Sequence, residues 1–132
     1  MNPLETKDIL NRLSSEIIGS AIEVHREMGP GLLESVYEIC LARELALKGI
    51  DFKRQVAIPV KYKTLQLDLD FRIDLLVEEE VVVEIKTVDT ILPIHEAQLL
   101  TYLKLSKKKL GLIINFNQAL LKDGIRRMVN GY

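Results

Sequence analysis

Apolar residues at every second position over residues 65–77 constrain the fold of this chain more than any other feature of its sequence. The odd positions hold leucine, phenylalanine, isoleucine or valine, whereas the even positions from 66 to 74 hold glutamine, aspartate or arginine. A period of two is the pattern of a β-strand with one buried face. We therefore predict a long strand over residues 65–77 whose odd-numbered side chains share one face.

The segment before this strand also alternates and predicts a hairpin. A turn at residues 63–64 would pair Val60 with Leu67 and Ile58 with Leu69, so that both apolar sets share a face. Pro59 predicts that the first strand lies at the edge of a sheet, because proline cannot donate a ladder hydrogen bond.

A second hairpin is predicted around the acidic residues 78–80, and its register follows from the charges. A slip of one residue would send charged side chains into the apolar layer. With a three-residue turn, the register that keeps these charges out of the apolar layer pairs Val77 with Val81 and places Asp74 directly opposite Glu84. Like charges in directly opposed positions are destabilising, because their Cβ atoms lie about 4.5–5.5 Å apart.

The other segments have helical spacing or short apolar runs. Gly29-Pro30-Gly31 separates two helical patterns, and the last residues fit either a short strand after a turn or a final helical turn. The predicted elements are helices 6–28, 32–48 and 94–107, strands 52–62, 65–77, 81–87 and 110–116, and a short C-terminal element. This order predicts an α/β (α+β) fold, with a mixed sheet flanked by helices, in one domain over residues 1–132.

Composition agrees with one globular domain. The chain has 132 residues, of which 48% are hydrophobic and 28% charged, and this excludes disordered and low-complexity classes. The formal net charge is −1, but residues 101–132 carry seven Lys or Arg and only one acid, Asp123.

Cys40 is the only cysteine, so no intrachain disulfide can form. Since there is no signal-peptide pattern and no apolar run of about 20 residues, we expect a cytoplasmic protein without membrane contact.

The chemistry is predicted at Asp74, Glu84 and Lys86, which share one face of two adjacent strands. Mg²⁺ keeps several waters and binds through one or two carboxylates plus substrate phosphate. A cation between the two carboxylates would convert their repulsion into binding, and Lys86 could position or deprotonate an attacking water. The alternative is that these charges form the solvated face of a half-covered sheet.

Three groups of residues resemble one family. Asp74, followed at ten residues by Glu-Ile-Lys, is similar to the signature of the PD-(D/E)XK nuclease superfamily, although Ile73 stands where the name has proline. Residues 31–38 resemble the G-x-x-E-x-x-Y signature of the GxxExxY proteins, and residues 98–102 resemble the Q-x-x-x-Y motif of RecB-type nucleases in the same superfamily. The resemblance covers residues 8–130 and implies a restriction-endonuclease-like core.

The resemblance implies a nuclease that uses Mg²⁺ or Mn²⁺ to hydrolyse DNA or RNA. Asp74 and Glu84 would bind the metal, with the backbone carbonyl of Ile85 as a third ligand. Lys86 would be the catalytic lysine. Glu34 would bind a metal-ligated water or a second metal.

The same resemblance implies that Gln98 and Tyr102 orient the lysine or contact substrate, whereas a buried polar cluster without a catalytic role is the alternative. Tyr37 fits either the signature or a plain core position. For Glu38 we expect an exposed position, because it lies one turn from Glu34 on the same helix face.

The basic end of the chain is predicted to hold phosphates. Lys107 and Lys108 follow a predicted helix, and Arg126 and Arg127 follow the last predicted strand, so both pairs would adjoin the site. A solubilising surface is the alternative. Two other functions stay open: a catalytically inactive nuclease-fold module for nucleic-acid binding or oligomeric interaction, and a resolvase-like homodimer acting on branched DNA.

Overall fold

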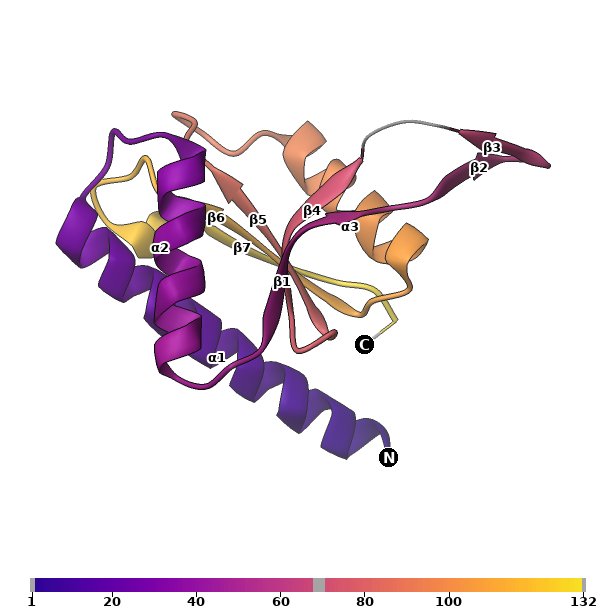
Figure 1. The fold of residues 1–132 in the computed structure, drawn as a ribbon, viewed down its shortest axis with the longest axis horizontal. Coiled ribbons are helices and arrows are strands. Elements are labelled where there is room, and N and C mark those ends of the chain that lie inside the picture. The colour runs from indigo at the N-terminus through magenta and orange to yellow at the C-terminus, as the bar shows by residue number, and fades with distance from the viewer. Residues whose placement is uncertain (1, 68–70, 132) are drawn as a thin grey trace.

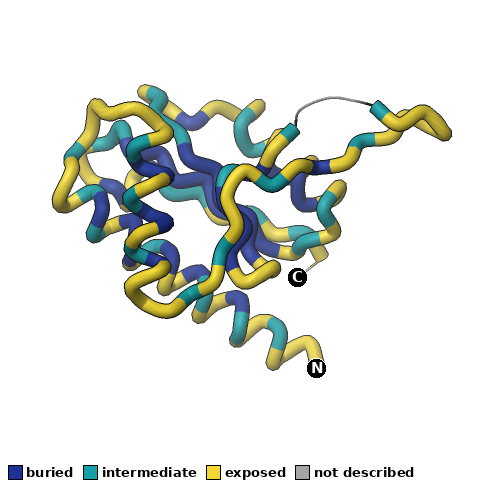
Figure 2. The backbone as a smooth tube through the Cα atoms, viewed as in Figure 1, coloured by how far each residue is buried: buried dark blue, intermediate teal, exposed yellow. Residues whose placement is uncertain are grey.

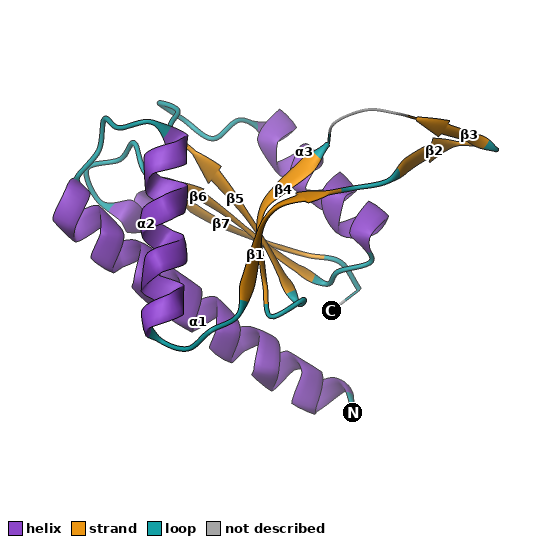
Figure 3. Ribbon diagram, viewed as in Figure 1, coloured by secondary structure: helices purple, strands orange, loops and turns teal. Residues whose placement is uncertain are grey.

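The computed structural model describes residues 2–67 and 71–131, and its centre is a mixed five-stranded sheet with helices on both faces (Figures 1 and 3). In spatial order the strands are β1 (Phe52–Ala57), β4 (Arg72–Val77), β5 (Val81–Lys86), β6 (Leu110–Asn115) and β7 (Ile125–Val129). β5 and β6 are parallel, and the other neighbours are antiparallel. The predicted α/β class and the mixed sheet flanked by helices are confirmed.

The three helices are α1 (Pro3–Met28), α2 (Glu34–Leu47) and α3 (Pro93–Ser106). α1 begins before the predicted residue 6, because the Asn2 side chain accepts a hydrogen bond from the backbone N–H of Glu5 at 2.9 Å and caps the helix. In the part of the chain that the structure describes, no helix combines the length and the hydropathy that a membrane span requires.

Two apolar clusters, one on each face of the sheet, hold these layers together. Buried side chains of α1 and α2 pack with Val83 of β5 and Leu112 of β6, whereas α3 packs with Val82 and Ile113 of the same two strands. Figure 2 shows the central strands β4, β5 and β6 as the buried interior. Full burial of one such side chain stabilises the fold by about 1.5–3 kcal/mol, so both faces are fixed by packing.

The register predicted for the acidic hairpin is confirmed. Val77 pairs with Val81, and Leu75 pairs with Val83. The three-residue turn places Glu78 and Glu79 in the left-handed region, with φ of 53° and 58°. β4 and β5 therefore bring Asp74 and Glu84 to the same end of the sheet.

The predicted strands 52–62 and 65–77 are each shorter in the structure. Beyond β1 and β4 the chain forms a separate two-stranded arm, β2 (Val60–Tyr62) and β3 (Leu65–Leu67), which projects from the body in Figure 1. Val60 pairs with Leu67 as predicted. The predicted pairing of Ile58 with Leu69 lies outside the described residues.

The prediction that all odd-numbered residues of 65–77 share one face is wrong at Ile73. Leu75 and Val77 pack in the cluster below α1 and α2, but Ile73 packs in the cluster below α3. Its β1 partner Val56 changes cluster in the same way. The change coincides with Gln55 of β1, which lies between Arg54 and Val56 and has φ of 53°, in the left-handed region.

The C-terminal segment contains both of the predicted alternatives. A short 3-10 turn, η1 (Leu121–Gly124), leads into β7, which pairs with β6 and forms the second edge of the sheet. Gly124 is required here, because a Cβ atom at this position would lie 2.3 Å from the carbonyl oxygen of Asn115.

Candidate active site

Asp74 and Glu84 lie just beyond the last pair of the β4–β5 ladder, Leu75 with Val83. The backbone N–H of Ile85 donates to Asp74 Oδ2 at 2.8 Å, and the backbone N–H of Asp74 donates to Glu84 Oε1 at 3.3 Å. Each strand thus orients the carboxylate of the other. The predicted apposition is present as these crossed contacts between carboxylate and backbone.

Glu84 occupies an electrostatically unfavourable position. It is only 7% exposed. Burial, and then the negative charge of Asp74, raise the pKa of Glu84 from 4.5 to about 8. Lys86 opposes this shift but does not cancel it. A bound cation would stabilise the ionised form of this pair, and such an arrangement is typical of functional sites.

Glu34 is the first residue of α2 and points toward the same charges. Partial burial raises the pKa of the Glu34 carboxyl group, the Lys86 ammonium group lowers it, and Asp74 raises it. The backbone N–H of Thr87, directly after β5, also interacts with Glu34. The structure therefore brings Glu34, Asp74, Glu84 and Lys86 to one end of the sheet.

Tyr37 fixes the loop from which Glu34 emerges. Its side chain is fully buried and stacks on Phe116 with ring centroids 4.4 Å apart. Its hydroxyl group donates to the carbonyl of Gly29 at 2.5 Å and accepts from the backbone N–H of Leu32 at 3.2 Å. Gly31, between these contacts, has φ of 95°. The three residues that resemble the G-x-x-E-x-x-Y signature thus have separate places: Gly31 lies in the loop, Glu34 supplies a carboxylate to the candidate site, and Tyr37 anchors the loop.

Residues of α3 lie next to Glu84. Gln98 donates to the hydroxyl oxygen of Tyr102 at 3.0 Å. Burial and the nearby negative charge of Glu84 raise the pKa of the Tyr102 phenol, which places this side chain beside the carboxylates. The helix lies close to the sheet because Leu99 packs over Gly111, where a Cβ atom would come within 2.8 Å of a Leu99 methyl group.

The basic residues are not gathered at this site. Lys107 and Lys108 follow the C-terminal end of α3, and Lys108 interacts with Glu79 at the opposite end of the sheet. Arg127 donates to Asn11 of α1 at 2.7 Å, on the other face. Of these four residues, Arg126 lies near the start of α3, 3.6 Å from Glu96. The expectation that both pairs adjoin the site is wrong, because parallel strands place residues 107–109 and the site at opposite ends.

Sequence reasoning missed two polar residues behind Asp74. Glu38, expected to be exposed, is 6% exposed and forms an ion pair with Arg54 at 2.8 Å. Gln55 donates to both Glu38 and Asp74. The sequence signal was the polar run Lys53-Arg54-Gln55 before the alternating residues, and that signal also fits a solvated edge.

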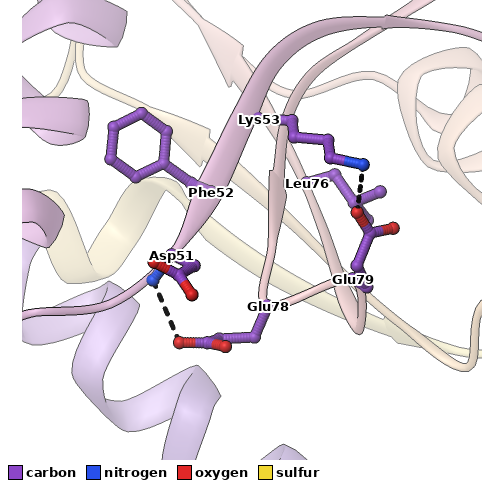
Figure 4. A pocket seen from close by; sticks show the side chains of 6 residues that line it. All are labelled: Asp51, Phe52, Lys53, Leu76, Glu78 and Glu79. Carbon is purple, nitrogen blue, oxygen red and sulfur yellow. Dashed lines mark hydrogen bonds and ion pairs between the residues drawn. The ribbon is translucent and has the colours of Figure 1, made fainter.

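One cavity of about 360 Å³ lies away from the candidate site, at the acidic turn (Figure 4). Its walls are tied by two contacts: Glu78 accepts from the backbone N–H of Asp51 at 3.0 Å, and Lys53 forms an ion pair with Glu79. None of the predicted site residues lines it. The candidate site is therefore defined by its side chains and their charges rather than by this cavity.

The donor set fits a hard divalent cation held by few protein ligands. Asp74 and Glu84 offer carboxylate oxygens, as Mg²⁺ prefers, and two carboxylates are enough for an ion that keeps several waters. Among the described residues, no group of three or more His, Cys, Asp or Glu is arranged to hold a metal. Glu34 is therefore near the pair without completing a three-carboxylate cage.

Comparison with known proteins agrees with this arrangement. A family model described as the PD-(D/E)XK nuclease superfamily matches residues 11–128. No curated protein and no solved structure gives a significant match. The family match spans α2, α3 and β1 to β6, together with α1 from residue 11 onward and β7 up to residue 128, and it includes Asp74, Glu84 and Lys86. The chain therefore belongs to the PD-(D/E)XK nuclease superfamily and has its restriction-endonuclease-like fold.

Proposed function

We propose that this protein is a metal-dependent nuclease that hydrolyses phosphodiester bonds of DNA or RNA. The observation that carries this proposal is the pair Asp74 and Glu84, two carboxylates brought together at the ends of adjacent strands, one of them buried with a raised pKa. Mg²⁺ or Mn²⁺, when bound, would supply Lewis-acid chemistry that polarises the phosphate and lowers the pKa of an attacking water.

The other residues of the site would act on water and phosphate. The Lys86 ammonium group would orient the attacking water and stabilise negative charge that develops on the phosphate oxygens. The Glu34 carboxylate, beside Lys86, would accept a hydrogen bond from water at the edge of the site. The backbone carbonyl of Ile85 would be a further oxygen donor to the metal.

α3 and β7 would contribute the contacts to substrate. Gln98 is exposed and hydrogen-bonded to Tyr102, so this pair would contact the nucleotide next to the scissile bond. Arg126 lies 3.6 Å from Glu96, near this end of α3, and would bind a backbone phosphate. Lys107, Lys108 and Arg127 would at most bind a longer nucleic acid that extends around the body.

We further propose that the chain is a single domain of the GxxExxY group and that it self-associates as a homodimer or a higher homo-oligomer. The Gly31, Glu34 and Tyr37 positions support this group, since each has a distinct role in placing the site. Sedimentation velocity at several protein concentrations tests self-association directly.

The decisive experiment measures metal binding and cleavage together. Single-stranded, duplex and branched DNA and RNA would be incubated with Mg²⁺ or Mn²⁺, and Mn²⁺ binding would be followed by isothermal titration calorimetry. We expect cleavage by the wild type, loss of both binding and cleavage in Glu84→Ala, and loss of cleavage with retained Mn²⁺ binding in Lys86→Ala. Nucleic-acid binding without cleavage under every condition would instead support the inactive module.

A further inference from the structure

Gln55 has a left-handed backbone conformation within the edge strand β1. Its φ is 53°, in the left-handed region, which costs roughly 1 kcal/mol or more for a residue other than glycine. The β1–β4 pairs on either side of it, Arg54 with Leu75 and Val56 with Ile73, are formed. The carbonyl of Gln55 accepts a hydrogen bond from Arg72 at 3.1 Å, which helps to hold this conformation.

This conformation lets one side-chain amide reach two carboxylates. Gln55 Nε2 donates to Glu38 Oε1 at 2.6 Å and to Asp74 Oδ1 at 3.3 Å. A glutamine amide nitrogen carries two hydrogens, so a single NH₂ group can serve both acceptors. Glutamate at this position would present a third negative charge to the same two carboxylates.

Glu38 is itself firmly held, so the link to Asp74 has a fixed anchor. Its Oε2 accepts from Arg54 Nε at 2.9 Å and lies 2.8 Å from Arg54 Nη2, which neutralises the buried charge. The anchor belongs to α2, one turn after Glu34. The contacts therefore run without a break from α2, through Gln55 of β1, to Asp74 of β4.

The effect on Asp74 is that both of its oxygens are oriented. Oδ2 accepts from the backbone N–H of Ile85, and Oδ1 accepts from Gln55. Groups that hydrogen-bond to metal ligands fix their orientation, and their loss typically costs about 10–100-fold in metal affinity or activity. A left-handed residue kept at such a contact is consistent with strain retained for a functional geometry.

We propose that Gln55 is a positioning residue of the metal site, and that it aims the Asp74 carboxylate by tying it to the Glu38–Arg54 ion pair. This inference rests on the proposed function, because it assigns Asp74 as a metal ligand. It also identifies α2 as part of the support of the site, beyond the contribution of Glu34.

Two variants separate the effect of the side-chain amide from the effect of the backbone conformation. Gln55→Gly removes the amide and accepts the left-handed conformation without strain, and Gln55→Glu keeps the length but replaces the donor by a carboxylate. The matched control is Lys63→Gly, since Lys63 also has a left-handed conformation, with φ of 55°, but lies on the arm between β2 and β3. We expect Mn²⁺ affinity, measured by calorimetry, to fall about 10-fold in Gln55→Gly, further in Gln55→Glu, and not in Lys63→Gly.

A second measurement needs no metal. In chelator, the ¹⁵N–¹H signal of the Ile85 amide should shift in both Gln55 variants and stay in place in Lys63→Gly, because this amide reports the orientation of Asp74. The unfolding temperature of Gln55→Gly in chelator should match that of the control, which separates positioning from stability.

The outcomes distinguish this inference from the proposed function. Wild-type Mn²⁺ affinity in Gln55→Gly and Gln55→Glu, with an unmoved Ile85 signal, would overturn the positioning role while leaving the nuclease proposal intact. Absence of Mn²⁺ binding in the wild type would overturn the metal chemistry. If the Ile85 signal still shifted in that case, Gln55 would orient Asp74 for a site that does not use metal, and the inference as stated would be wrong.

Discussion

The hydroxyl group of Tyr37 donates a hydrogen bond to the carbonyl oxygen of Gly29 at 2.5 Å, eight residues earlier in the chain. This contact connects the core of the protein to the loop before α2. Because the loop leads directly to Glu34, a core residue controls where a site carboxylate emerges.

Tyr37→Phe should therefore weaken both folding and cleavage. The ring still stacks on Phe116, but the Gly29 carbonyl and the Leu32 N–H lose their partner, at a cost of about 1–3 kcal/mol in the free energy of unfolding. Urea denaturation measures this loss, and cleavage at a temperature where the variant is folded measures the displacement of Glu34. Tyr62→Phe is the control, since Tyr62 is 62% exposed. Equal stability of the two variants would contradict the anchoring role.

Without metal, the free energy of unfolding should fall as the pH rises from about 4.5 to about 8. The pKa of Glu84 is about 8 in the folded protein and 4.5 for an unperturbed glutamate, so over this interval the folded state retains a proton that the unfolded state releases. One proton corresponds to a slope of at most about 1.4 kcal/mol per pH unit.

Glu84→Gln removes this titration and tests it. We expect the variant to be more stable than the wild type in chelator at pH 8, with the difference shrinking toward pH 5. Chemical denaturation across this range gives the comparison. Parallel stability curves for the two proteins would show that Glu84 ionises normally in the fold.

Gly124→Ala should destabilise the fold by about 1–3 kcal/mol or more, because the new methyl group would lie 2.3 Å from a backbone oxygen of Asn115. Asn115 in turn bonds both backbone groups of Val88, just after β5. Thermal unfolding tests this expectation.

The control is Gly19→Ala, in the middle of α1, where the nearest neighbour is Lys48 Nζ at 3.8 Å. This variant should stabilise the protein by up to about 1 kcal/mol. Similar losses in both variants would rule out a specific clash.

Nucleic-acid affinity should depend on Arg126 more than on Lys107. Arg126 lies beside Glu96 at the start of α3, whereas Lys107 follows its end. Arg126→Ala should weaken binding and reduce the slope of log affinity against log salt by about 1, as expected for one lost phosphate contact. Fluorescence anisotropy in chelator, over a range of salt concentrations, measures both quantities. A larger change in Lys107→Ala than in Arg126→Ala would move the substrate path to the opposite end of the sheet.

The β4–β5 hairpin could be predicted because charged and apolar side chains alternate along part of its sequence. The register around residues 78–80 followed from keeping Asp74 and Glu84 out of the apolar layer, and the structure has that register. The proximity of these two carboxylates depended only on this hairpin. Local patterns are reliable where a one-residue shift would reverse every side chain.

What could not be predicted depends on contacts between distant segments. The change of face at Ile73 coincides with one left-handed residue, Gln55, on the neighbouring strand. The burial of Glu38 depends on a partner 16 residues away, Arg54. Spacing on one helix predicted exposure for Glu38, because a single sequence carries no signal for a charge supplied by an adjacent strand.

The arm has a consequence for how this fold can diversify. Ala57 pairs with Arg72, and the N–H of Ile58 donates to the carbonyl of Phe71 at 2.8 Å, so the β1–β4 hairpin is already closed where the arm begins. Among the described residues, β2 and β3 pair only with each other. The arm thus extends from a completed hairpin, and shortening it should leave the geometry around Asp74 and Glu84 unchanged.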